Sequence, residues 1–304
     1  MTKLKKTQGL IVAPLTPMHP DGSVFYERID EQAEMFQRNG LVGVFICGTT
    51  GESLSLSVAE RKQIAETWMQ VKNPSLRCIV HVGHNCFDCS KELAQHAQSI
   101  GAQAIAAFPP VYYKPSTMDS LTHWFKALAV ATELPIYYYN IPSMTGVNFP
   151  MRDFLEKLDD LDNLAGVKYT HEDLYDFGRC LDFKPEKYDI LFGRDEMLLS
   201  ALALGARGAV GGLYNFAAPL FYRIIDAFNN GEPRTAQAFQ QKARELANIY
   251  FKYGGSIATV KAMMKIAGLD CGPVRLPIKK VTEQQYARMK TELESVGFLD
   301  YCMA

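Results

Sequence analysis

One lysine of this chain lies where an amine could react with a carbonyl group. Lys168 ends the apolar run Leu164–Lys168, which has the composition of a buried strand. Burial disfavours the charged ammonium, lowers its pKa and yields the free amine that forms a carbinolamine and then an imine with a keto group. Because buried lysines are rare, position alone leaves catalysis and an amine that reaches solvent as equal alternatives.

A tyrosine lies at the matching depth of a second predicted strand. Tyr139 ends the run Pro135–Tyr139, and its phenol could carry a proton between a substrate oxygen and its surroundings. The structural alternative is a core tyrosine with a hydrogen-bonded hydroxyl. That alternative is the favoured interpretation for Tyr137 and Tyr138.

Two further motifs could bind the polar groups of a substrate. In GTTGE, residues 48–52, the backbone N–H groups and the hydroxyls of Thr49 and Thr50 suit a carboxylate or another small anion, although a structural turn is the alternative. Asp195 and Glu196 could accept hydrogen bonds from sugar hydroxyls. They also begin a predicted helix, where the helix dipole favours acidic side chains without any function.

A group of metal-ligating side chains occurs at close spacing, namely His81, His84, Cys86 and Cys89. A structural zinc site requires four converging ligands. This segment runs from strand through loop to helix, and neither a second C-x-x-C nor a later H-x₃-H accompanies it. We therefore expect no metal.

Eight short apolar runs must position these residues. They are Leu10–Ala13, Val42–Cys47, Arg77–Val82, Ala102–Phe108, Pro135–Tyr139, Leu164–Lys168, Tyr188–Phe192 and Ala206–Gly211. Helical stretches alternate with them, one opened by a capping box at Ser57 and Glu60. No G-x-G-x-x-G or GK[ST] loop follows the first run, which disfavours an open nucleotide-binding sheet. The pattern predicts the α/β class, as a (β/α)8 TIM barrel.

The strands stop near residue 217, and three helical stretches follow: Pro233–Tyr253, Ile257–Ala267 and Thr282–Ser295. We expect residues 1–216 to form the barrel core. Residues 217–304 would hold the last barrel helix and a C-terminal helical cap packed on the barrel, because no linker separates them. In such barrels the active site lies at the carboxyl ends of the strands, where all the residues above fall.

Composition limits the partners. The formal net charge of −1 and the lack of a basic block argue against nucleic acid. No apolar segment is long enough for a membrane span, and the seven scattered cysteines fit reduced thiols. The chain is thus expected to be a soluble cytoplasmic protein.

Taken together, the motifs resemble the N-acetylneuraminate lyase branch of the dihydrodipicolinate synthase family. GTTGE, YNIPSMTG, GVKYT, GRDE and GAVGGLYN occur in the family's order and spacing, within a resemblance from residue 10 to residue 277. It implies a (β/α)8 barrel with a helical cap, usually a homotetramer, and class I aldolase chemistry without a cofactor. The implied reaction is reversible cleavage of N-acetylneuraminate, a sialic acid, to N-acetylmannosamine and pyruvate.

The resemblance also implies roles, residue by residue. Lys168 matches the Schiff-base lysine and Tyr139 the tyrosine that relays protons beside it. Thr49 and Thr50, with the N–H groups around Gly51, match the carboxylate-binding set. Tyr112 matches a tyrosine that completes the hydroxyl network at or near a subunit interface. The positions that contact the sugar-derived portion are matched by Thr170, Gly193, Asp195, Glu196 and Gly212.

Three residues bear on the substrate. Dihydrodipicolinate synthases usually carry arginine where this chain has Met144, which argues against that activity. Gly212 replaces a serine common in the lyase branch, and the cationic Arg194 stands beside the two acids. The same imine chemistry on another sialic acid or a 2-keto-3-deoxy sugar acid therefore stays open. A keto-acid-binding relative without turnover and a metal-dependent aldolase are the remaining alternatives.

Overall fold

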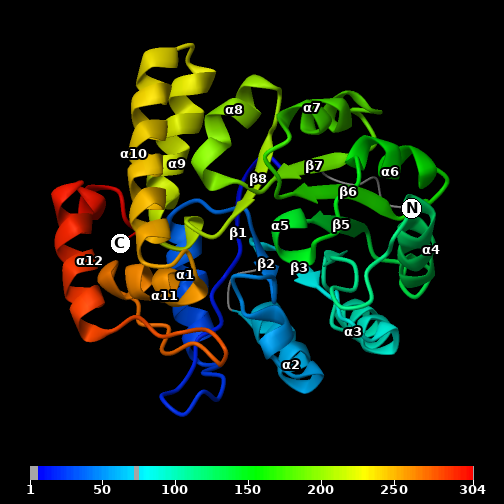
Figure 1. Ribbon diagram of the computed structural model, residues 1–304, viewed down its shortest axis with the longest axis horizontal. Helices are drawn as coiled ribbons and strands as arrows, with labels where there is room; N and C mark the ends of the chain where they lie inside the picture. Colours follow the sequence, from blue (N-terminus) through cyan, green and yellow to red (C-terminus); the bar gives the residue numbers. More distant parts are fainter. Residues whose placement is uncertain (1–5, 72–74, 304) are drawn as a thin grey trace.

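Eight parallel strands close into a barrel in the computed structural model, which describes residues 6–71 and 75–303 (Figure 1). The strands are β1 (Gly9–Val12), β2 (Gly43–Ile46), β3 (Arg77–His81), β4 (Ala104–Ala107), β5 (Ile136–Asn140), β6 (Leu164–Tyr169), β7 (Asp189–Phe192) and β8 (Gly208–Gly211). β1 pairs with both β2 and β8, which closes the ring. Each lies within or next to its predicted run, and the predicted (β/α)8 fold class is confirmed.

Helices between the strands, and one after the last strand, surround the barrel. They are α1 (Arg28–Arg38), α2 (Val58–Gln70), α3 (Phe87–Ser99), α4 (Met118–Ala129), α5 (Pro142–Thr145), α6 (Met151–Lys157), α7 (Leu174–Asp182), α8 (Leu198–Ala203) and α9 (Tyr214–Asn229). The capping box at the start of α2 is confirmed, because Ser57 and Glu60 each accept the other's backbone N–H. The helix predicted to begin at Asp195 and Glu196 differs at its start, where the 3₁₀ turn η2 (Asp195–Met197) precedes α8.

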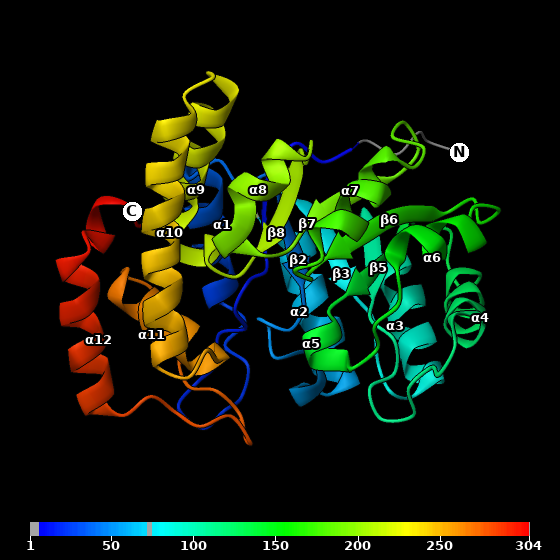
Figure 2. The same ribbon diagram turned by 45° about the horizontal axis from the view of Figure 1, so that its top comes forward.

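The C-terminal extension is helical, as predicted, and consists of α10 (Pro233–Lys252), α11 (Ile257–Ile266), α12 (Glu283–Ser295) and the 3₁₀ turn η3 (Phe298–Asp300). Figures 1 and 2 show these helices, yellow to red, gathered on one side of the barrel near α9 and α1. The backbone N–H of Met303 donates to the Phe216 carbonyl, 2.7 Å away, and ties the extension back to α9. The predicted domain division after residue 216 falls inside α9, where Ala217 departs from helical geometry (φ −123°, ψ 20°). Among the described helices, none is both long and apolar enough to cross a lipid bilayer.

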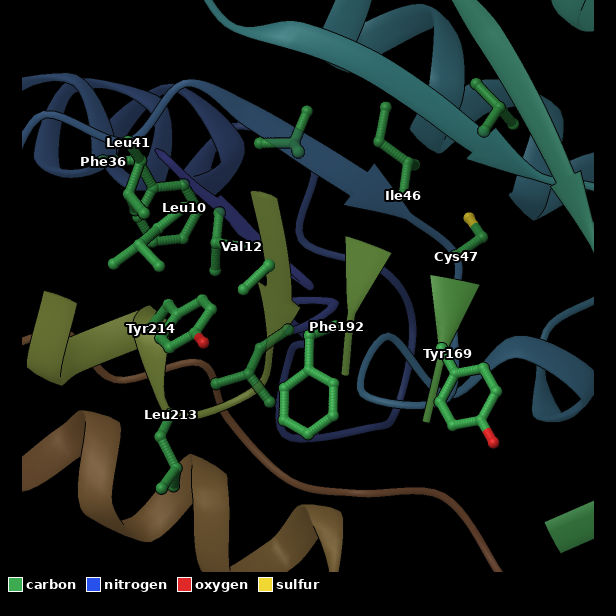
Figure 3. Close-up of a cluster of buried hydrophobic side chains, with 14 of the residues drawn as sticks. Leu10, Val12, Phe36, Leu41, Ile46, Cys47, Tyr169, Phe192, Leu213 and Tyr214 are labelled. Carbon is green, nitrogen blue, oxygen red and sulfur yellow. The ribbon is translucent and has the colours of Figure 1, made fainter. Parts of the chain in front are cut away.

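Two apolar layers hold the barrel together. The outer layer lies between strands and helices, and Figure 3 shows part of it, including Leu10, Phe36 and Tyr214. The inner layer fills the barrel with side chains such as Phe45 and Tyr137. Small inward residues elsewhere, including those of β4, leave room for these rings, so the interior is packed rather than hollow.

Tyr137 and Tyr138 are core residues, as predicted. The Tyr137 hydroxyl donates to the buried Asp189 carboxylate at 2.8 Å and accepts from Arg77 at 2.9 Å. Tyr138 points the other way, into the outer layer, where its ring lies 4.5 Å from that of Phe154.

An irregularity in β6 decides which way Lys168 points. Ile136 of β5 pairs with Leu164, but the next residue, Tyr137, pairs with Gly166, so Ala165 is an extra residue in β6. Such a bulge shifts the alternation of side chains by one position. Gly166 has a φ of +149°, and a Cβ there would lie 2.1 Å from the Asp189 carbonyl oxygen, so glycine is required. Beyond the bulge Val167 faces the outer layer, and Lys168 faces inward.

Candidate active site

Lys168 is buried at the barrel mouth. Only 4% of the residue is exposed, and its Nζ lies 3.9 Å from the ring centre of Tyr139 and 4.1 Å from that of Phe45. No carboxylate of the described residues forms an ion pair with it. Of the two alternatives for this lysine, the structure favours the buried amine over one that reaches solvent.

Tyr139 pairs with Lys168 across β5 and β6 and is also buried. Its hydroxyl lies 3.2 Å from the Thr49 Oγ1, so the phenol and the threonine hydroxyl share a hydrogen bond. Phe45 contacts the tyrosine ring edge-on at 5.3 Å between ring centres, and His81 does so at 5.8 Å. The rings fix the phenol in one place, close to the amine, as proton transfer at a neighbouring atom requires.

The GTTGE motif forms a tight turn directly after β2. The N–H of Gly51 donates to the Gly48 carbonyl and that of Glu52 to the Thr49 carbonyl, both at 3.0 Å. From the loop after β1, the Thr16 hydroxyl donates to the Gly51 carbonyl at 2.7 Å. The non-glycine residues at its ends, Cys47 (φ 55°) and Glu52 (φ 64°), are held in left-handed conformations. Such conformations persist only where the surrounding structure imposes them, so the fold holds this turn in one conformation.

A second buried cation lies behind this turn. Arg61 is 1% exposed, and its guanidinium donates to the carbonyls of Gly83 (3.0 Å) and His81 (2.6 Å). No carboxylate of the described chain pairs with it. The pKa of His81 lies well below its ordinary value because the ring is buried and the charges of Arg61 and Lys168 oppose protonation. Buried charges are normally paired, so the unpaired guanidinium of Arg61 beside a neutral histidine favours the binding of an anion.

The opposite side of the mouth presents oxygen atoms suited to hydroxyl groups. The carboxylate of Asp195 is buried beside β8 and accepts the Leu213 N–H at 2.8 Å through Oδ2. Its Oδ1 and the Thr170 Oγ1 are buried and lack a hydrogen-bond partner among the described residues. Burial raises the pKa of Asp195 to about 7. Unpaired buried oxygen atoms are costly, so both suit the hydroxyl groups of a polar substrate.

Glycines let these oxygen atoms approach the backbone. A Cβ at Gly211 would lie 2.0 Å from Asp195 Oδ1, and one at Gly193 would lie 2.1 Å from Thr170 Oγ1. Any side chain there would displace the aspartate or the threonine. Of the predicted sugar-contacting residues, the structure thus places Thr170 against Gly193 and Asp195 against Gly211.

Glu196 and Arg194 lie at the edge of the mouth. Arg194 Nε is 3.1 Å from the Glu196 carboxylate, and the same guanidinium pairs with Glu172. Glu196 also lines a groove of about 330 Å³ against α10, next to Arg244. The positive charge beside the two acids is therefore already engaged by carboxylates.

Of three other residues singled out in the sequence, one lies beside the turn and two lie at the surface. Gly212 lies next to Thr50, because a Cβ on it would be 3.3 Å from the Thr50 Oγ1. Met144, on α5, is exposed at the surface. Tyr112 is 77% exposed, with its ring 4.9 Å from that of Tyr113, and the structure does not bring it to Lys168 within this chain.

Sequence reasoning missed Phe45 and Arg61 and read His81 only as a metal ligand. The alternation of β2 could have placed Phe45 inside the barrel, but nothing local in the sequence signals a buried arginine. Within the residues that the structure describes, no three His, Cys, Asp or Glu side chains converge as a metal site. His84 instead accepts the Cys86 N–H at 3.0 Å.

The chain is similar to known proteins over nearly its whole length. Residues 6–296 match the model of the dihydrodipicolinate synthetase family. The N-acetylneuraminate lyase of Rattus norvegicus is 38% identical over 303 residues, which cover 98% of this chain and 95% of that protein. Two solved structures are also similar. The N-acetylneuraminate lyase of Aliivibrio salmonicida has a TM-score of 0.94 at 37% identity, covering 97% of this chain and 99% of its own. That of Proteus mirabilis has a TM-score of 0.93 at 36% identity, covering 97% and 100%.

The match to the family model covers nearly the whole chain. The rat protein aligns over nearly its full length, and the two solved structures are similar to this one over nearly all of both chains. The lysine, tyrosine and threonine turn meet at the mouth of that barrel. The chain belongs to the dihydrodipicolinate synthetase family.

Proposed function

We propose that this protein is a class I aldolase that cleaves N-acetylneuraminate reversibly to N-acetylmannosamine and pyruvate through an imine on Lys168. The observation that carries the proposal is the buried amine of Lys168 beside the Tyr139–Thr49 hydrogen bond. Full-length similarity to N-acetylneuraminate lyases supports the choice of substrate.

The turn positions the substrate. In the open-chain sugar acid, the carboxylate accepts hydrogen bonds from the hydroxyls of Thr49 and Thr50. It also accepts from backbone N–H groups of the turn ahead of Gly51, because the N–H groups of Gly51 and Glu52 bond within the turn. The charge of the buried Arg61 guanidinium favours this anion. The C2 carbonyl then lies against the Lys168 amine, and loss of water from the carbinolamine gives the imine.

Cleavage follows because the imine accepts electrons. Tyr139, which gives its own proton to the departing water as the protonated imine forms, then takes the proton of the C4 hydroxyl while the C3–C4 bond breaks. The released electrons form an enamine on Lys168. The buried oxygens of Thr170 and Asp195 hold the sugar hydroxyls, and N-acetylmannosamine leaves. Protonation of the enamine and hydrolysis of the imine return pyruvate and the free amine.

Trapping tests the proposal. Incubation of the intact protein with pyruvate and borohydride should add a stable mass, which peptide mapping places on Lys168. In a separate assay, the protein should release pyruvate from N-acetylneuraminate. A protein that binds pyruvate but gives neither the adduct nor the product would be a binding relative without turnover.

Gly212 bears on the second candidate, a different sugar acid with the same imine chemistry. Gly212→Ser should raise kcat/KM for N-acetylneuraminate about three- to tenfold relative to shorter 2-keto-3-deoxy acids, because one added hydrogen bond to the glycerol-like tail has that value. Steady-state kinetics on both substrates measure it. Gly212→Ala is the matched control, since it adds the Cβ near Thr50 without the hydroxyl. If the serine variant slows both substrates equally, the tail does not reach this position.

The assembly is part of the proposal. A cytoplasmic homotetramer is what the family resemblance implies, and the 77% exposure of Tyr112 suits a residue that lies at a subunit interface. Sedimentation equilibrium that gave the mass of a single 34.0 kDa chain would contradict the tetramer.

A further inference from the structure

The carboxylate-binding turn ends in a residue whose side chain points away from the site. Glu52 is 4% exposed, and its left-handed backbone turns the chain from the binding loop into η1 (Ser53–Ser55). Because its carboxylate is fully shielded from solvent, the conformation depends on the groups that face it from elsewhere in the fold.

Those groups come from the C-terminal extension. The Nζ of Lys261, on α11, lies 2.8 Å from the Glu52 Oε1, with 4% of the lysine side chain and none of the glutamate side chain exposed. Lys261 also donates to the Pro273 carbonyl at 2.6 Å. The backbone N–H of Arg275 donates to the other glutamate oxygen at 2.9 Å. Lys261 and Arg275, more than 200 residues further along the sequence, thus bind the carboxylate of the last residue of the turn.

Arg275 also binds the residues that follow the turn. The Arg275 guanidinium donates to the Ser55 carbonyl at 3.0 Å and pairs with the Glu60 carboxylate, with an N–O distance of 2.8 Å for one of its nitrogens. These bonds hold η1 and the start of α2, which follow the turn directly. The turn, α11 and the segment between α11 and α12 therefore form one connected unit.

The ion pair between Lys261 and Glu52 also affects the charge at the turn. Without Lys261, the turn that receives the substrate carboxylate would carry a buried negative charge at its own end. Like charges in a weakly screened interior repel over such distances. With Lys261 in place the pair is neutral, and the buried Arg61 remains as a cation without a carboxylate partner among the residues described.

We propose that Lys261 is a positioning residue of the aldolase: it neutralises Glu52 and so keeps the GTTGE turn able to accept the carboxylate of the keto acid. This inference rests on the proposed function. It makes the helical extension a part of the binding site through the contact of Lys261 with Glu52.

Three variants separate charge from structure: Lys261→Met, Glu52→Gln and the double variant. The readout is the pyruvate concentration that gives half-maximal borohydride trapping on Lys168, which reports binding of the carboxylate. In Lys261→Met this concentration should rise at least about tenfold, because Glu52 is left uncompensated. Glu52→Gln should not raise it more than about twofold, since the extra positive charge favours the anion. The double variant should return to within about threefold of the wild type.

The opposite pattern would overturn the inference. If the pair is only a structural tether, both single variants weaken binding equally and the double variant does not recover. Should Lys261→Met fail to fold, Glu52→Gln decides alone, because a tenfold loss of affinity in it contradicts the charge argument. Lys252→Met is the matched control, as Lys252 pairs with Glu292 at 2.7 Å in the same extension but at the surface. A wild type that forms no adduct refutes the proposed function instead.

Discussion

Lys168→Met is expected to lower pyruvate release from N-acetylneuraminate by at least about 10³-fold, because covalent catalysis is lost with the nucleophile. Methionine keeps an unbranched apolar chain between Phe45 and Tyr139, so the barrel should fold. Lys261, the other buried lysine of the described chain, is paired with Glu52 and does not replace the lost amine. Steady-state kinetics and intact-mass measurement after borohydride treatment check both effects.

The control for this variant is Lys265→Met, which removes an exposed lysine that pairs with Asp270. It should retain wild-type kinetics and the pyruvate adduct. Thermal unfolding of all three proteins distinguishes loss of chemistry from loss of structure. A Lys168→Met protein that still gives the trapped adduct would place the imine on another lysine.

Tyr139→Phe should lower kcat for N-acetylneuraminate cleavage about 10²- to 10⁴-fold, the usual contribution of a positioned acid or base. Phenylalanine keeps the ring beside Lys168 and its contacts with Phe45 and His81. It removes only the hydroxyl that lies 3.2 Å from Thr49. Pyruvate should therefore still bind, and the adduct on Lys168 should still form at saturating pyruvate, while cleavage is slow.

Tyr138→Phe is the matched control because the two tyrosines are neighbours on β5 with opposite directions. The Tyr138 ring packs in the outer layer against Phe125 and Phe154, away from the amine. Its variant should keep kcat and KM close to the wild-type values. Full activity in Tyr139→Phe would assign the proton transfer to another group.

Much of this molecule was predictable from its sequence because the information is local. Buried parallel strands are continuous apolar runs, and all eight could be located in this way. The ends of those strands define one mouth, which brought Lys168, Tyr139 and the threonine turn together without any knowledge of distances. α4 gives a weaker signal, since its capping box uses Thr117 and Ser120 rather than a glutamate or glutamine.

The rest depends on contacts between distant parts of the chain. Glu52 and Lys261 are separated by most of the barrel sequence, and no pattern around either one announces the other. Arg61 reads as an ordinary residue on the polar face of α2, yet it is 1% exposed because the carbonyls of Gly83 and His81 receive its guanidinium. Residues of this kind are defined by the assembled fold rather than by their neighbours in sequence.

The extra residue in β6 changes which side chains of the strand face the barrel interior from that point on. The first half of β6 must alternate to suit the core, while the second half must aim an amine at the substrate. Because of the bulge, the side-chain directions of the second half do not depend on those of the first half. Loss of one residue ahead of Gly166 would rotate Lys168 into the helix layer with its chemistry intact but out of reach. Installing an imine-forming lysine in another barrel strand is therefore first a question of counting residues from the bulge, and only then of choosing its neighbours.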